Sequence, residues 1–249
     1  MLVAMQKNEW WEPGHVAIVT GASKGFGRAV ASLLAQRGIS LVVDARGEDA
    51  LDAAAAEFGE HTRVRAVPGD VADSDHVHRL VNVADEAFGR IDLVVNNAST
   101  IGRSPMPHLE NLSPQTFDRL FTTNVYAPLH LIQHALPIMR RNGGGTIVNV
   151  SSDAGVVAYE GWGGYGSSKA ALDQVSAVMA AEEPDIKVYA LDPGDMRTAM
   201  HQRAYPGEDI SDRPEPEVSA PAILRLVAER PRSGRYRAAS VLDASLVAT

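Results

Sequence analysis

The fold is decided by the stretch His15-Val-Ala-Ile-Val-Thr20-Gly21-Ala-Ser-Lys24-Gly25-Phe-Gly27. Its first part is a short apolar run with β-branched residues, which is typical of a buried parallel strand. The glycines follow at once, and a helical pattern then runs from Arg28 to Gln36. Glycines let the backbone approach a phosphate closely, and a helix N-terminus offers amide donors. This order of elements predicts a loop that binds a dinucleotide pyrophosphate; an ordinary strand–helix turn is the alternative.

Strand and helix patterns alternate along the rest of the chain, which is typical of an α/β protein with one doubly wound sheet. The expected strands are 39–43, 63–67, 91–95, 146–150, 185–191 and one around 238–242; the expected helices are 48–58, 74–88, 113–139, the residues after Tyr165, and 218–229. We expect a leader at residues 1–14 and one domain at 15–249. The proline-rich residues 199–217 are expected to form a loop that covers the binding site.

Composition and charge limit the classes of partner. The 249 residues carry a formal net charge of −8, which argues against nucleic acid or an anionic membrane as the main partner. There is no cysteine, no apolar run near the roughly 20 residues of a membrane span, and the N-terminus is too polar for a secretory signal. We expect a cytoplasmic protein without a metal site, in which His76 and His78 are solvated.

The end of the second expected strand bears on nucleotide specificity. An acidic residue about 20 positions after the glycine loop binds the ribose diol of NAD in many such folds, and Asp44 is the candidate. Neighbouring residues at a strand end point opposite ways, however, and counting along the strand places Ala45 and Arg46 toward the ribose. Arg46 and Lys24 are then suited to a 2′-phosphate, so we favour NADP over NAD. The alternative for both cations is plain surface charge.

Polar residues follow the third and fourth expected strands. Asp70 is suited to accept from an adenine amino group while Val71 packs on the ring, or to cap the helix that begins near Ser74. Asn97 and Ala98 belong to an Asn-Asn-Ala-Ser turn after 91–95, where strand ends meet a ligand in this class of fold; turn chemistry is the alternative.

An asparagine also interrupts a helical pattern. Asn124 lies within the helix expected for 113–139, where Asn is a poor helix former. It indicates either a carbonyl exposed by a break in the hydrogen-bond ladder or a bound water.

A hydroxyl, a phenol and an ammonium follow the fifth expected strand. Ser152 precedes Tyr165 by thirteen residues, and Lys169 stands four residues after Tyr165, one turn along a helix. A nearby ammonium favours a phenolate and lowers the pKa of a tyrosine. Such a tyrosine can exchange a proton with a substrate oxygen near neutral pH, and Ser152 can hydrogen-bond the same oxygen. The alternative is a chance spacing on a solvated helix face.

Taken in order, these motifs resemble the short-chain dehydrogenase/reductase family, in the branch with TGxxxGxG and YxxxK motifs. The resemblance runs from about His15 to Thr198 and is looser beyond. The motifs that carry it are Thr20-Gly21-xxx-Gly25-x-Gly27, Asp70-Val71, Asn96-Asn97-Ala98, Asn124, Ser152, Tyr165-xxx-Lys169 and Pro193-Gly194. The departures from the family pattern include Ser99, where the family usually has Gly and which we expect to be tolerated, and Asp195, an acidic group near the nicotinamide end of the cofactor.

The resemblance implies a single-domain Rossmann fold with about seven parallel strands, and NAD(P)-dependent reduction of carbonyls or oxidation of alcohols. Tyr165 would be the general acid/base, Lys169 would lower its pKa and bind the nicotinamide ribose, Ser152 would hold the substrate oxygen, and Asn124 would keep a relay water. The residues implied in cofactor binding are Gly21, Ser23, Lys24, Gly25, Phe26, Gly27, Arg46, Asp70, Val71, Asn97, Ala98, Tyr165, Lys169, Pro193, Gly194, Met196 and Thr198. It also implies a homodimer or homotetramer.

Two other functions are compatible with such a fold: a dinucleotide-binding regulator or scaffold without catalysis, and a sugar-nucleotide epimerase or dehydratase. All four catalytic positions are filled, which favours the oxidoreductase. The substrate is expected to be a small carbonyl or alcohol, walled by residues 100–108, 153–162 and 199–217. Tyr159 and Trp162 indicate an apolar or aromatic contact. Arg103, Arg197, His201 and Arg203 are either anion-binding residues or surface charges.

Overall fold

A computed structural model describes residues 14–243, which form one seven-stranded parallel sheet with the strand order β3-β2-β1-β4-β5-β6-β7. The strands are β1 (Val16–Val19), β2 (Ser40–Ala45), β3 (Val64–Pro68), β4 (Leu93–Asn96), β5 (Gly145–Val150), β6 (Ile186–Asp192) and β7 (Gly234–Arg237). The predicted doubly wound α/β sheet is confirmed. The predicted leader falls outside the described residues, apart from Gly14.

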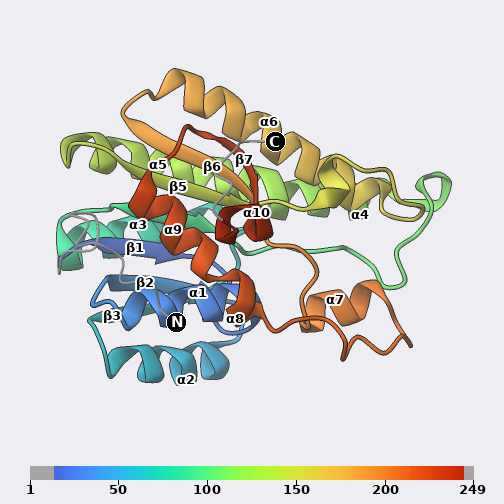
Figure 1. Cartoon of the computed structure of the whole chain (residues 1–249), viewed down its shortest axis with the longest axis horizontal. Helices are drawn as coiled ribbons and strands as arrows, with labels where there is room; N and C mark the ends of the chain where they lie inside the picture. Colours follow the sequence, from blue (N-terminus) through green and yellow to red (C-terminus); the bar gives the residue numbers. More distant parts are fainter. Residues whose placement is uncertain (1–13, 244–249) are drawn as a thin grey trace.

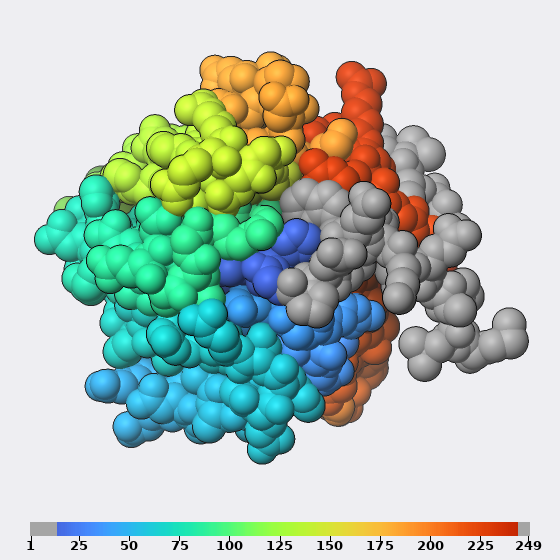
Figure 2. Space-filling view, turned by 90° about the vertical axis from the view of Figure 1, so that its left-hand side faces the viewer, coloured from blue at the N-terminus to red at the C-terminus, as the bar shows by residue number. Residues whose placement is uncertain are grey.

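Helices cover both faces of the sheet (Figure 1). On one face α1 (Gly25–Ala35), α2 (Glu48–Gly59) and α9 (Pro221–Glu229) pack on the buried side chains of the strands. On the other face lie α3 (Ser74–Phe88), α5 (Ala127–Arg141) and α6 (Gly163–Glu182). Figure 2 shows the molecule from the left-hand side of Figure 1. In this view α6 (orange), α5 (yellow-green) and α3 (blue-green) lie one below the other on the surface. This layering explains why the central strands are buried apolar runs without alternation.

The helical region expected for 113–139 is interrupted. Ser113 caps α4 (Pro114–Phe121) by accepting from the Thr116 amide, and a π-helical turn, Thr122–Tyr126, joins α4 to α5. The turn contains Asn124, so the predicted break in the ladder lies where the asparagine indicated it.

Two expectations for the last third of the chain are wrong in detail. The last strand is β7 at Gly234–Arg237, and the residues expected as strand form α10 (Ala238–Leu242). Here Tyr236 is buried beside β6 and completes the sheet, whereas alanines favour the helix that follows.

The expected loop 199–217 contains a helix, α7 (Ala199–Ala204), and ends in α8 (Pro216–Ser219). Thr198 caps α7 by accepting from the His201 amide. The α7 segment lies beyond the end of the sheet, on the right of Figure 1. Among residues 14–243, no helix has the length and apolar character that a membrane span requires.

Candidate active site

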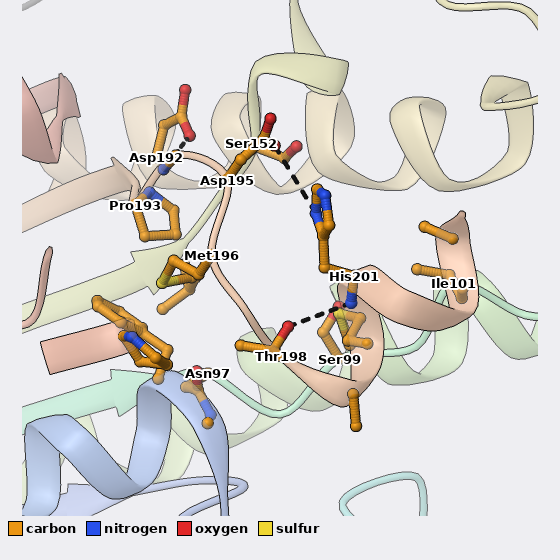
Figure 3. A pocket seen from close by; sticks show the side chains of 18 of the residues that line it. Asn97, Ser99, Ile101, Ser152, Asp192, Pro193, Asp195, Met196, Thr198 and His201 are labelled. Atoms are coloured by element: carbon orange, nitrogen blue, oxygen red, sulfur yellow. Dashed lines mark hydrogen bonds and ion pairs between the residues drawn. The ribbon is translucent and has the colours of Figure 1, made fainter. Parts of the chain in front are cut away.

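A cavity of about 620 Å³ opens where the carboxyl ends of β1, β4, β5 and β6 meet α6 and α7 (Figure 3). Among the predicted site residues it is lined by Lys24, Gly25, Phe26, Asn97, Ala98, Ser152, Tyr165, Lys169, Pro193, Gly194, Met196 and Thr198. The predicted residues that do not line it are Gly21, Ser23, Gly27, Arg46, Asp70, Val71 and Asn124. Segments separated by more than a hundred residues therefore converge on one site, as the crevice rule for parallel sheets predicts.

The glycine loop is closed by Asn97. Its Nδ2 donates to the carbonyl oxygens of Thr20 (2.8 Å) and Gly21 (3.2 Å). A Cβ at Gly27 would lie 2.3 Å from the same Nδ2 and 2.5 Å from the Gly21 oxygen, so only glycine fits there. Asn97 thus holds the loop in addition to lining the cavity.

The N-terminus of α1 is suited to an anion. Lys24 is its N-cap residue, with extended backbone and no side-chain cap hydrogen bond, and the first turn carries no acidic residue. The first amides of the helix therefore lack a side-chain acceptor, as a phosphate-binding turn requires. This geometry fits the pyrophosphate of a dinucleotide.

Asp44 is buried and faces inward. Its Oδ1 accepts from the Gly21 amide (2.7 Å), and its Oδ2 lies 3.0 Å from Nε2 of His76. Asp44 and His76 are both fully buried, so the prediction that His76 is solvated is wrong; His78 is exposed as expected. His76 lies with Val77 on the buried face of α3. Its position on that face of the helical pattern is the feature of the sequence from which its burial could have been predicted. His76 thus holds the Asp44 carboxylate, which in turn holds the Gly21 amide of the glycine loop.

The capping alternative for Asp70 is also wrong. Asp73 caps α3 by accepting from the Asp75 amide, while Asp70 accepts from the Ala72 amide at 3.0 Å. Arg46 is exposed at the end of β2, directly after the buried Ala45.

Lys169 is buried beside Tyr165. Its Nζ donates to the Val150 carbonyl oxygen (2.7 Å) and lies 5.5 Å from the centre of the Tyr165 ring. Burial lowers the pKa of Lys169 to about 8, and the charge of Asp173, one turn further along α6, opposes this shift.

The pKa of Tyr165 differs from the prediction. Burial raises it above that of a free phenol, and hydrogen bonds with Ser152 and Ser99 act in the opposite direction. The ammonium of Lys169 points to the backbone of β5, and its effect on the pKa of Tyr165 is smaller than that of burial. In the protein without cofactor, desolvation of Tyr165 raises its pKa by more than the Lys169 ammonium lowers it.

Ser99 is a site residue that the sequence interpretation missed. Besides its bond with Tyr165, its Oγ donates to Oδ1 of Asn124 (3.1 Å). Asn124 is buried and donates in turn to the Thr100 carbonyl and to Ser168 Oγ, each at 2.9 Å. Asn124 therefore reaches Tyr165 through Ser99, although it does not line the cavity.

Comparisons with known proteins agree with this geometry. Residues 15–209 match the family model described as short chain dehydrogenase. An oxidoreductase of Saccharomyces cerevisiae, named only as uncharacterized, is 33% identical over 189 residues, covering 75% of this chain and 72% of the yeast protein. A short-chain dehydrogenase structure from Pseudomonas syringae has a TM-score of 0.86 at 28% identity, covering 95% of this chain and 98% of its own. One from Shigella flexneri, solved in complex with NADP, has a TM-score of 0.82 at 28% identity, covering 91% and 98%. The chain therefore belongs to the short-chain dehydrogenase family of NAD(P)-dependent oxidoreductases.

Proposed function

We propose that the protein is an NADP(H)-dependent oxidoreductase that moves a hydride between the nicotinamide and a carbonyl or secondary alcohol, with Tyr165 as general acid/base. The observation that carries the proposal is the phenol of Tyr165, hydrogen-bonded to Ser152 at the cavity beside the buried ammonium of Lys169. Nothing in this arrangement favours a regulator without catalysis.

Different residues of the chain would bind different parts of the cofactor. The amides at the start of α1 would hold the pyrophosphate, and Pro193 to Thr198 would lie along the nicotinamide. Arg46 and Lys24, both exposed at the ribose end, favour a 2′-phosphate, and the neighbour from Shigella flexneri was solved with NADP. Lys169 would also bind the nicotinamide ribose.

The bound cofactor supplies the hydride, and the chain positions the substrate and moves the proton. In the reductive direction the Tyr165 hydroxyl donates its proton to the substrate oxygen, and Ser152 Oγ donates a hydrogen bond to the same oxygen. Ser152 Oγ lies 3.1 Å from Oδ1 of Asp153, so its hydroxyl must turn from Asp153 to the substrate. A protonated Lys169 stabilises the phenolate that remains, and Ser99 with Asn124 lies on the route by which the proton is replaced.

The test is substitution of Tyr165 by Phe. The variant should bind NADPH with an affinity near that of the wild type, because the ring remains, and its kcat should fall by about a thousandfold or more, because the acid is lost. Loss of NADPH absorbance with a panel of ketones measures turnover, and quenching of protein fluorescence measures binding. Wild-type kcat in the variant would disprove the mechanism, and tighter binding of NADH than of NADPH would disprove the cofactor assignment.

A homodimer or homotetramer and a cytoplasmic location stay predictions from the sequence. Light scattering coupled to size-exclusion chromatography measures the first, and cell fractionation the second.

A further inference from the structure

We propose that the substrate carries a cationic amine a few bonds from its carbonyl, with the ammonium held by Asp153 against the rings of Tyr159, Trp162 and Tyr205. The inference rests on the proposed function, since it names the substrate class of the same site. It concerns the part of the cavity between α7 and the start of α6.

An aromatic wall lines this part of the cavity. Trp162 stands at its centre, with ring centres 6.1 Å from Tyr159, 5.7 Å from Tyr205 and 5.8 Å from Tyr165. All four rings line the cavity. Aromatic faces attract cations, and several rings around one site bind an ammonium more strongly than an uncharged group of the same shape.

Two carboxylates complete the wall. Asp153 accepts from Ser152 Oγ (3.1 Å) and from the Tyr159 hydroxyl (2.7 Å), and within residues 14–243 it has no cationic partner. Asp195 also lines the cavity, 3.8 Å from Arg213 Nε and from His201 Nδ1.

The charges of Asp153 and Asp195 act on the phenols of Tyr159 and Tyr205. The pKa of Tyr159 is raised, first by its hydrogen bond to Asp153 and also by the charges of Asp153 and Asp195. The pKa of Tyr205 is raised by burial and then by the charges of Asp195 and Asp153. The charge of Arg213 opposes the two carboxylates at Tyr205 but acts more weakly than either, so the charges around the aromatic wall favour a cation there.

His201 gives an independent indication that the substrate carries a hydrogen-bond donor. Its side chain is 10% exposed, and its Nε2 has no hydrogen-bond partner in the part of the chain that the structure describes. The ring projects from α7 toward Asp195 and Ser152 (Figure 3). In the neutral tautomer whose Nδ1–H faces the Asp195 carboxylate, 3.8 Å away, Nε2 is an acceptor. An acceptor suits the N–H of an ammonium.

Of the four residues that the sequence offered for an anionic substrate, His201 lines the cavity, whereas the three arginines are engaged elsewhere or lie outside it. Arg197 pairs with Glu215, and Arg203 donates to the Gly102 carbonyl oxygen. Neither Arg103 nor Arg203 lines the cavity. The substrate end of the cavity is thus better matched to a positive group than to a negative one.

The positions of Ser152 and Asp153 limit the length of the substrate. Ser152 Oγ would hold the carbonyl oxygen, and Oδ1 of Asp153 lies only 3.1 Å from it. With one ordinary hydrogen bond on each side, the substrate oxygen and nitrogen lie within about 9 Å of each other. A ketone with its amine two or three carbons away meets this limit.

The test compares three ketones of nearly one shape. 3-(Dimethylamino)propiophenone carries the ammonium, 4-methyl-1-phenylpentan-1-one replaces the nitrogen by carbon, and 3-benzoylpropionate carries a carboxylate. For the wild-type enzyme with NADPH, kcat/KM for the amino ketone should exceed that for the carbon analogue about tenfold or more, and the carboxylate should be the poorest substrate.

Substitution of Asp153 by Asn should bring the ratio between amino ketone and carbon analogue to near one. Because the ratio is taken within each variant, a general effect on turnover cancels. Asp52→Asn, at an exposed site on α2 outside the cavity, is the matched control and should keep the wild-type ratio.

Each outcome separates this inference from the proposed function. A wild-type ratio near one, a ratio unchanged by Asp153→Asn, or a preference for the carboxylate would overturn the amine assignment while the enzyme remains a ketone reductase. If none of the three ketones is reduced, the amino-ketone assignment is wrong, and the proposed function is then judged by the wider panel and by NADPH binding.

Discussion

The guanidinium of Arg235, on β7, donates from Nη2 to the main-chain carbonyl oxygen of Ser152 over 3.0 Å. Arg235 Nε also donates to Asp173 of α6 (3.1 Å), and Nη2 lies 3.4 Å from Asp192 at the end of β6. Asp192 in turn accepts from the Gly194 amide at 3.0 Å. One mostly buried side chain thus joins the serine, the helix of Tyr165 and the turn that would face the nicotinamide.

Substitution of Arg235 by Met should lower kcat by about 10- to 100-fold, because the Ser152 backbone and the Asp192 turn lose a common anchor. It should also lower the free energy of unfolding by about 3 kcal/mol, since two mostly buried carboxylates lose their guanidinium. Steady-state kinetics and urea unfolding measure the two effects.

Arg235→Lys is the matched control, because lysine keeps the positive charge but lacks the planar guanidinium that donates several hydrogen bonds at once. Relative to the Met variant, it should recover most of the stability and only part of kcat. A Met variant that is folded at the assay temperature and has wild-type kcat would show that Arg235 does not position the site.

Lys169 should make the stability of the protein depend on pH in the alkaline range. Burial lowers the pKa of Lys169 from 10.5 to about 8. Between these values the unfolded chain binds more protons than the folded one, so the free energy of unfolding rises with pH. Relative to Lys169→Met, the wild type should gain about 3 kcal/mol between pH 7 and pH 11.

Urea unfolding of both proteins at several pH values measures this difference, and other titrating groups cancel in the comparison. A gain smaller than the error of the unfolding curves would mean that Lys169 keeps an ordinary pKa in the folded state.

Arg46 should determine the choice of cofactor. Arg46→Ala should weaken NADPH binding about tenfold or more and leave NADH binding nearly unchanged, because only NADPH carries the 2′-phosphate. Titration of each cofactor against protein fluorescence gives both constants. Arg119→Ala, at an exposed position on α4, controls for the loss of surface charge. Equal effects of the two substitutions would assign the 2′-phosphate to other residues.

His76 should stabilise both the fold and the cofactor loop. His76→Leu leaves Oδ2 of the buried Asp44 without its imidazole partner, which should cost about 1–3 kcal/mol of unfolding free energy. The Asp44 bond to the Gly21 amide should loosen as well, so NADPH binding should weaken.

Urea unfolding and NADPH titration measure these effects, and His76→Gln, which keeps an N–H donor, should lose less of both. His61→Leu, at an exposed position, is the control for the change of residue type. If His76→Leu and His61→Leu are equally stable, the buried pair contributes nothing to the fold.

The features that the sequence determined by itself are local ones. The strand–glycine–helix order at β1 and α1, the alternation of strands and helices, and the Tyr165–Lys169 spacing on α6 all depend on residues close together in the chain. Periodicity and backbone preference act over a few residues, so a pattern is enough to predict them. The break at Asn124 was found for the same reason, from a residue that does not suit a helix.

Only the tertiary structure decided which distant side chains meet. Arg235 and Ser152 are 83 positions apart, and His76 and Asp44 are 32 apart. Which face of β2 Asp44 occupies depends on packing against α3, and the pKa of Tyr165 depends on how far the surrounding residues desolvate the phenol. These properties arise from burial and from the register of the sheet, which a local pattern does not contain. Ser99, interpreted from the sequence as a tolerated small residue, is a hydrogen-bond partner of Tyr165 only because the fold places the turn after β4 beside the start of α6.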